Sequence, residues 1–468
     1  MARWVLVVLV VELYYTNMTK RCKILVTVLL TSSLLPVAAM AQEQKTSAMT
    51  LHDCMEYAVS NSTKMRIQAA DRSDEQWQRR HAIMQAFTPT LSAQTYAYNQ
   101  YGRNLDPETN TYNNVTTFHN GYGVSAGITL FDGFQAVNNL RMASTSVKMG
   151  ASKEQQERDQ ICLATMEAFA NVLYYSEMVQ VVADQVETAK TARDRAVRQE
   201  ELGQKGHADV VQMESELAQK EYLLISTTNE KNNAILTLKD VMYWPADEEL
   251  VLDTNVQEPM CGGIDAASLE MTAKSFLPSA QIASFSVKNA TLDLKSARGA
   301  YSPSIGLYGG WSTTYYTYPG MAGYTPAPFG DQFRNNGGEY IQLQLNIPIF
   351  DQFRRRTNLQ QKKNALARAE AQYDQTMRDI ENEVRRAVSD RDGAQAAFHQ
   401  AERLADVQQE AYQLSTKQFE TGLISAIEYQ TASQTYLNAM AERMNSLLQL
   451  KIKDAVVRYY NGETYINQ

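Results

Sequence analysis

One five-residue pattern occurs twice in this sequence, and the repetition limits the possible folds more than any other feature. The pattern "LFDGF" spans residues 130–134, and "IFDQF" spans residues 349–353. Asp132 and Asp351 are therefore 219 positions apart (351 − 132 = 219). The same offset joins two further pairs, Gly203 with Gly422 and Asp209 with Glu428. A constant offset over this distance predicts two duplicated halves of matching architecture.

The N-terminal residues predict export from the cytoplasm. Basic residues precede the apolar stretch "ILVTVLLTSSLLPVAAMA", which ends in an A-x-A cleavage pattern at Ala41. We expect residues 1–41 to be a signal peptide, with Met18 as a possible true start. The formal net charge is −8, and removal of this basic segment makes the chain more acidic, so nucleic acid is not expected as a partner.

Two long stretches have the composition of helices. Residues 134–202 and 352–421 contain no proline and one glycine each. Each stretch is predicted to form one helix about 100 Å long, at about 1.5 Å per residue. In the second stretch, apolar residues recur at the 3-4 spacing of a coiled-coil seam, interrupted by Arg391: Leu366, Ala369, Tyr373, Met377, Ile380, Val384, Ala387, Ala394, Phe398, Ala401 and Ala405. A free-standing dimeric coiled coil would explain the seam but not the segments that precede each helix.

A β-hairpin is predicted before each long helix. "EYIQLQLNIPIF" and "GYGVSAGITLF" alternate apolar and small or polar residues, which is the period of a half-buried strand. "TLSAQTYAYNQY" and "SIGLYGGWSTTYY" are the expected partner strands, joined to them by loops at about 102–117 and 317–337. These strands are about as long as the ~9 to 11 residues that cross a bilayer, and their tyrosines lie near the loops.

Four such strands cannot close a barrel, and lipid does not tolerate an open sheet edge. Two chains would give a barrel with a filled interior, whereas three chains would give twelve strands and a lumen. We therefore expect a trimer. The expected order is a signal peptide (1–41), a first repeat helix (42–86), a first hairpin (87–133), a first helical hairpin (134–244), a connector (245–268), a second repeat helix (269–300), a second hairpin (301–351), a second helical hairpin (352–460) and a tail (461–468).

Enzyme chemistry is not indicated. The segment "GVSAG" at 123–127 matches a nucleophile-elbow pattern, but a strand continues through it where that motif needs a helix. The histidines lack metal-ligand spacing, and no phosphate-binding loop is present. We expect no catalytic residue, no metal and no cofactor. The run Arg354-Arg355-Arg356 fits either a solvated helix face or an anchor on anionic headgroups.

Together these motifs resemble the TolC-type outer membrane efflux proteins. The resemblance covers residues 49–462 and rests on "MTLHDCMEYAVSNS", on "FTPTL" and "YSPSI", on the two strand-to-helix patterns, and on "ELGQKGHADVVQMESELAQ" and "FETGLISAIEYQTASQTYL". It implies an α+β membrane protein: a trimeric twelve-stranded β-barrel with four strands per chain, continuing into a twelve-helix periplasmic α-barrel.

The resemblance also implies a function. Such a channel lies in the outer membrane with a large periplasmic part and is the exit duct of efflux pumps or of type I secretion. It works with a periplasmic adaptor and with an inner-membrane transporter of the RND or ABC type. A periplasmic adaptor is the alternative, but an adaptor would have one helical hairpin flanked by small β-domains.

The family's functional positions can be carried over to this sequence. Gly203 and Gly422 match turns at the periplasmic tip, and Asp132, Gly133 and Asp351 match the strand-to-helix turns. A constriction is expected at Asp209, Phe419 and Glu428, with Thr431 where other members have a second aspartate. For the two acidic residues, helix-start chemistry is an equal explanation, as is packing for Phe419.

Overall fold

The computed structural model describes residues 48–105, 110–114, 116–253, 266–319, 321 and 323–467. The predicted signal peptide (1–41) and most of the predicted connector (254–265) lie outside these residues. Within the described part, no helix is both long and apolar enough to cross a membrane. The described residues belong to one compact unit, Ala48–Gln468.

The elements follow each other in two similar series. In the first half they are α3 (Leu51–Asn61), α4 (Thr63–Phe87), β1 (Thr90–Gln100), β2 (Arg103–Leu105), β3 (Tyr112–Asn114), β4 (Thr117–Phe131), α5 (Gln135–Glu201) and α6 (His207–Met242). In the second half they are α7 (Ala266–Phe276), α8 (Pro278–Gly299), β5 (Ser304–Thr317), α9 (Phe329–Asn335), β6 (Gly338–Asn346), α10 (Arg354–Glu420), α11 (Ala426–Tyr460) and the 3-10 turn η1 (Tyr465–Asn467).

The four long strands form one antiparallel sheet in the order β1-β4-β5-β6. The predicted alternation holds, because Val124 pairs with Trp311 while its neighbour Ser125 pairs with Gly310. One face is therefore mainly apolar and the other is polar. Strands β1 and β6 each have a partner on one side only, so the sheet is open at both edges.

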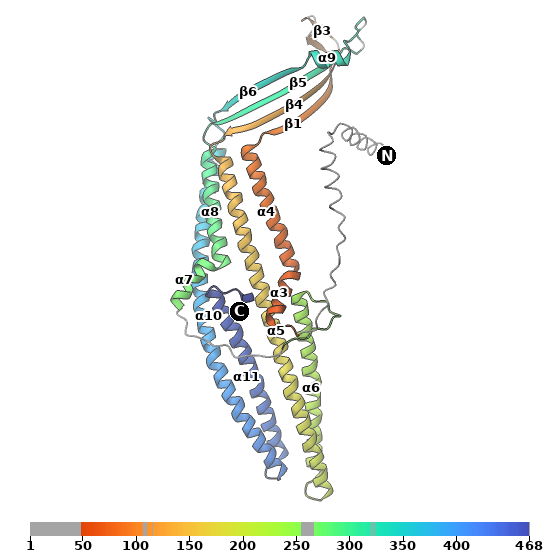
Figure 1. Ribbon diagram of the computed structural model, residues 1–468, viewed down its shortest axis with the longest axis vertical. Helices are drawn as coiled ribbons and strands as arrows, with labels where there is room; N and C mark the ends of the chain where they lie inside the picture. The colour runs from red at the N-terminus through yellow and green to blue at the C-terminus, as the bar shows by residue number, and fades with distance from the viewer. Residues whose placement is uncertain are drawn as a thin grey trace, which may run out of the picture. The chain divides into compact units, whose positions relative to one another are not determined.

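Each half has one long helix that turns back into a second helix. Helices α5 and α10 are both 67 residues long, which makes the duplication visible in the structure. Helix α5 packs along α6, and α10 packs along α11, as Figure 1 shows. The seam predicted in α10 is buried at Ile380, Val384, Ala387, Phe398, Ala401 and Ala405, and Arg391 is buried with it.

Two ranges predicted to hold one helix hold two. In the range 42–86, α3 ends at Asn61. Ser62 follows with an extended backbone, and its hydroxyl accepts hydrogen bonds from the backbone N–H groups of Lys64 (3.2 Å) and Met65 (3.5 Å) at the start of α4. In the range 269–300, Pro278 begins α8, because proline lacks the N–H needed inside a helix. The two predicted loops also contain structure, namely the β2–β3 hairpin and the short helix α9.

The short helices before the sheet have different surroundings. Helix α8 packs against both α5 and α10, whereas among the described elements α4 packs chiefly against α5. Helix α8 buries several residues, including Leu292 and Leu294, but the only buried residue of α4 is Ala82. On the opposite side α4 exposes Trp77 (62%) and Met84 (56%). One long side of α4 therefore lacks an apolar partner within the described chain.

Candidate functional site at the helical tips

The two hairpin turns, residues 202–206 and 421–425, share one geometry. Gly203 (φ +72°) and Gly422 (φ +76°) both have the left-handed backbone that glycine adopts without a side-chain penalty. The N–H after each glycine bonds back into the preceding helix, from Gln204 to the carbonyl of Gln199 (2.8 Å) and from Leu423 to that of Gln418 (2.9 Å). These glycines therefore end α5 and α10 at matching positions.

The two predicted acidic residues lie at the start of the returning helices. Glu428 accepts hydrogen bonds from the backbone N–H (2.8 Å) and the hydroxyl (3.1 Å) of Ser425. The backbone hydrogen bond is the main reason that the pKa of Glu428 is lowered from its usual range. Asp209 accepts a longer bond from the N–H of Gly206 (3.4 Å). Thr431 donates to the carbonyl of Ile427 (2.8 Å), one turn earlier in the same helix.

Phe419 lies inside the protein, between the two hairpins. Its side chain is 5% exposed and stacks on Tyr429 with ring centroids 5.0 Å apart. The ammonium group of Lys205, from the first hairpin, lies 3.9 Å from the centre of the Phe419 ring. Burial lowers the pKa of Lys205. This contact joins the first turn to the end of α10.

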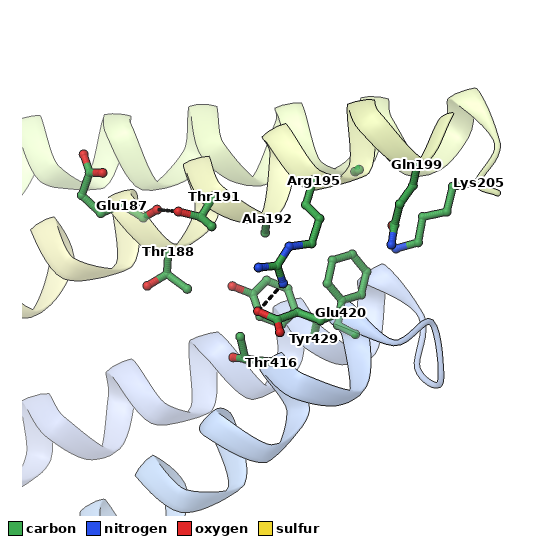
Figure 2. Close-up of a pocket in the computed structure, with 12 residues that line it drawn as sticks. Glu187, Thr188, Thr191, Ala192, Arg195, Gln199, Lys205, Thr416, Glu420 and Tyr429 are labelled. Carbon is green, nitrogen blue, oxygen red and sulfur yellow. Dashed lines mark hydrogen bonds and ion pairs between the residues drawn. The ribbon is translucent and has the colours of Figure 1, made fainter. Parts of the chain in front are cut away.

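A groove of about 280 Å³ lies between the hairpins beside these residues, and Figure 2 shows its lining. Arg195 of α5 reaches across it to form an ion pair with Glu420 of α10. Both side chains are more than a third exposed, so solvent weakens this pair. The ion pair and the Lys205–Phe419 contact are two links between the hairpins, and sequence reasoning identified neither because their partners lie more than 200 positions apart.

A buried ion pair lies further along α6. Glu216 and Lys220 have side chains 2% and 6% exposed, and their charged atoms are 3.8 Å apart. Burial raises the pKa of Glu216 and lowers that of Lys220, and in each case it is the largest cause of the change. The sequence shows only an i,i+4 pair, which usually lies on a solvated helix face. Its burial results from packing of α6 in the assembled hairpins.

The strand-to-helix turns differ between the halves. Asp132 accepts a hydrogen bond from the N–H of Ala136 (2.8 Å), and Asp351 accepts one from Arg355 (3.1 Å), so both carboxylates cap a long helix. Gly133 has φ +70°, and a Cβ there would come within 2.2 Å of the carbonyl oxygen of Gly299. The matching position, Gln352, keeps a left-handed backbone (φ +58°) with a full side chain.

The described residues contain no group of three or more histidine, cysteine or acidic side chains that could hold a metal ion. Ser125, in the "GVSAG" segment, lies within β4, and its hydroxyl is 2.9 Å from that of Ser92 on β1. This position is inside a sheet and not in a strand-to-helix turn, so the geometry is not that of a nucleophile elbow.

Comparison with known proteins identifies the second half of the chain. Residues 277–462 match the sequence model of the outer membrane efflux protein family. They are an outer membrane efflux protein domain. This match confirms the predicted resemblance and the outer-membrane location, and it places the domain in a transport family. No curated protein sequence is similar enough to the chain to match it.

Solved channels share the fold of the efflux protein domain and of the half before it. CusC has a TM-score of 0.73 at 15% identity, over 88% of this chain and 92% of its own. VceC of Vibrio cholerae has a TM-score of 0.72 at 14% identity, over 89% of this chain and 96% of its own. The MtrE channel of Neisseria gonorrhoeae, solved in an open state, has a TM-score of 0.70 at 17% identity, over 89% of this chain and 89% of its own. The predicted fold class is confirmed, with four strands and two long helical hairpins per chain.

Proposed function

We propose that the protein is the exit channel of a tripartite efflux pump or a type I secretion system. Three copies would join their sheets into a barrel that spans the outer membrane. The observation that carries this proposal is a four-stranded sheet that is open at β1 and β6 and apolar on one face. Lipid requires such edges to be paired, and three chains supply twelve strands around a lumen.

The helices support the same arrangement. Helix α8 lies between α5 and α10, and the duplication predicts an equivalent place for α4. We propose that α4 lies between its own α5 and the α10 of the next copy. Repeated three times, this contact closes a ring of helices that continues from the barrel. Its partners would be a periplasmic adaptor and an inner-membrane transporter.

The tips are the proposed constriction and docking end. Asp209 and Glu428 would form rings of carboxylates around the axis, with Thr431 one turn further along, and narrow acidic rings favour cations. Phe419 would act differently, holding the hairpins together through Lys205 and Tyr429, because its ring is buried. On the second turn Leu423 (76%) and Ile427 (66%) are exposed, which suits contact with an adaptor.

Single-channel conductance in planar bilayers tests this proposal. We expect a small conductance from the wild-type protein and an increase of about twofold or more in Asp209→Ala/Glu428→Ala, because the narrowest ring is widened. Glu214→Ala removes an exposed carboxylate five residues after Asp209 in the same helix, which at about 100° per residue lies on a different face, and it is the matched control, with an unchanged conductance. Folded protein that never conducts would refute the channel, and conductance unaffected by the double substitution would refute the constriction.

A further inference from the structure

The polar face of the sheet carries no Asp, Glu, Lys or Arg along the four described strands. The pairing register defines this face, and apart from the tyrosines its only titratable side chain is that of His119. Its members are Thr90, Ser92, Gln94, Tyr96, Tyr98, Gln100, Thr117, His119, Gly121, Gly123, Ser125, Gly127, Thr129, Ser304, Gly306, Tyr308, Gly310, Ser312, Thr314, Tyr316, Gly338, Tyr340, Gln342, Gln344 and Asn346. Tyrosine, glycine and small amide or hydroxyl side chains therefore make up this surface.

Three of the tyrosine rings lie over glycines of the sheet. A Cβ at Gly121 would come within 2.3 Å of the Tyr96 ring, and one at Gly127 within 2.7 Å of the Tyr308 ring. A Cβ at Gly310 would come within 2.9 Å of the Tyr340 ring. The glycines thus leave the space that lets each ring rest against the backbone.

The rings remain accessible from the side away from the sheet. Tyr96, Tyr308 and Tyr340 are between 39% and 49% exposed. Tyr98 stacks on His119 with centroids 4.9 Å apart, and Tyr96 stacks beside Tyr98 at 6.0 Å. Aromatic side chains thus extend across β1, β4, β5 and β6, with glutamine and serine side chains between them.

We propose that this face binds uncharged compounds whose rings have an apolar face and carry hydroxyl groups, and guides them through the barrel. The proposal rests on the proposed channel, because only a closed barrel makes this face a lumen. Accessible aromatic rings stack on flat apolar ring faces, and neighbouring amides and hydroxyls hydrogen-bond to hydroxyl groups. Without acidic or basic side chains, the wall provides no formal charge to select or hold ions.

Current block by added solutes tests the proposal. The probes are maltohexaose, a chain of sugar rings, and catechin, a hydroxylated aromatic compound; polyethylene glycol of similar size is the ringless control. Each is added to the barrel side of reconstituted wild-type channels, and the concentration for half-maximal block is measured. We expect one or both ring probes to block at about tenfold lower concentration than polyethylene glycol. The two probes distinguish sugar from aromatic cargo.

Substitutions locate the effect on this face. In Tyr96→Leu/Tyr308→Leu/Tyr340→Leu, the half-blocking concentration of a ring probe should rise about tenfold. Gly121→Ala/Gly127→Ala should weaken block by lifting the rings while keeping every tyrosine. Gly123→Ala is the matched control on the same strand, since no atom lies closer than 3.7 Å to a Cβ there.

Two results would overturn the inference: ring probes that block no better than polyethylene glycol, or block that survives the tyrosine substitutions. Each of these two results can be obtained only with a channel that conducts, so neither can be confused with a failure of the proposed channel function. That failure would appear as folded protein without conductance and would remove the lumen together with this inference.

Discussion

Helices α4 and α8 hold equivalent places in the two halves, yet only α8 is enclosed. Helix α8 lies against both long helices, whereas α4 faces α5 and exposes Trp77 and Met84 on its far side. The two halves are thus alike in sequence order but unequal in burial within one chain. In the proposed trimer, α10 of the next copy would supply the neighbour that α4 lacks.

The halves also differ inside the helical hairpins. At the offset of 219 positions, the buried pair Glu216 and Lys220 of α6 corresponds to Thr435 and Ala439 of α11. The first half thus buries two charges at positions where the second half has an exposed Thr435 and a buried Ala439. The strand-to-helix turns differ too, because Gly133 is crowded by the Gly299 carbonyl and the matching Gln352 is exposed. Each difference can be tested by transferring one half's residues into the other.

The largest effect is expected on the far side of α4. Seven residues turn a helix by about 700°, so Trp77 and Met84 share one face. Both side chains are exposed although α4 packs along α5. Trp77→Glu/Met84→Glu should abolish the trimer, since an aromatic anchor such as Trp77 contributes about 2 kcal/mol or more once buried at an interface, and the two new charges would be buried there too. Light scattering after size-exclusion chromatography in detergent measures the mass. Gln76→Glu/Gln78→Glu, on exposed flanks of the same helix, should leave the trimer intact.

The buried pair in α6 comes next. Lys220→Ala should lower the free energy of unfolding by about 3 to 5 kcal/mol, because Glu216 is left buried and charged. Glu216→Thr/Lys220→Ala installs the residues of α11 and should restore most of that loss. Thermal unfolding followed by circular dichroism measures both. A double variant as unstable as the single one would show that the two charges do not act as a pair.

The same variant should respond to pH in a defined direction. Burial raises the pKa of Glu216 above its ordinary value of 4.5, and loss of Lys220 raises it further. The folded state then binds more protons than the unfolded state, so stability of Lys220→Ala rises as pH falls from 7 through the raised pKa. The difference in unfolding midpoint between Lys220→Ala and the wild type should therefore be smaller at pH 5 than at pH 7.

The smallest effect is expected at the strand-to-helix turns. Gly133→Gln should destabilise by about 2 kcal/mol or more, because a Cβ there meets the carbonyl of Gly299 and the backbone is left-handed. Gln352→Gly removes a side chain from a residue with a left-handed backbone and should change the free energy of unfolding by about 1 kcal/mol at most. Similar effects at both turns would refute the difference in crowding.

Local patterns in the sequence were sufficient for much of the fold. The alternation in β4 and β6, the proline-free helices and the repeated turn glycines each follow from periods or backbone angles that single segments determine. The breaks at Ser62 and Pro278 had local signals too, a capping serine and a proline at the first helical position. The family resemblance then supplied the positions of the turns and the expected constriction.

Contacts between distant segments could not be deduced in this way. A helical period shows which side chains share a face, but not which partner covers that face, so the sequence did not indicate that α8 is enclosed while α4 is open. The burial of Phe419 under Lys205, the burial of Glu216 with Lys220, and the tyrosine rings over Gly121 and Gly127 all join separate elements. The sequence determined the elements and their order, whereas the tertiary structure decided which polar and aromatic groups became buried, because burial depends on neighbours far apart in the chain.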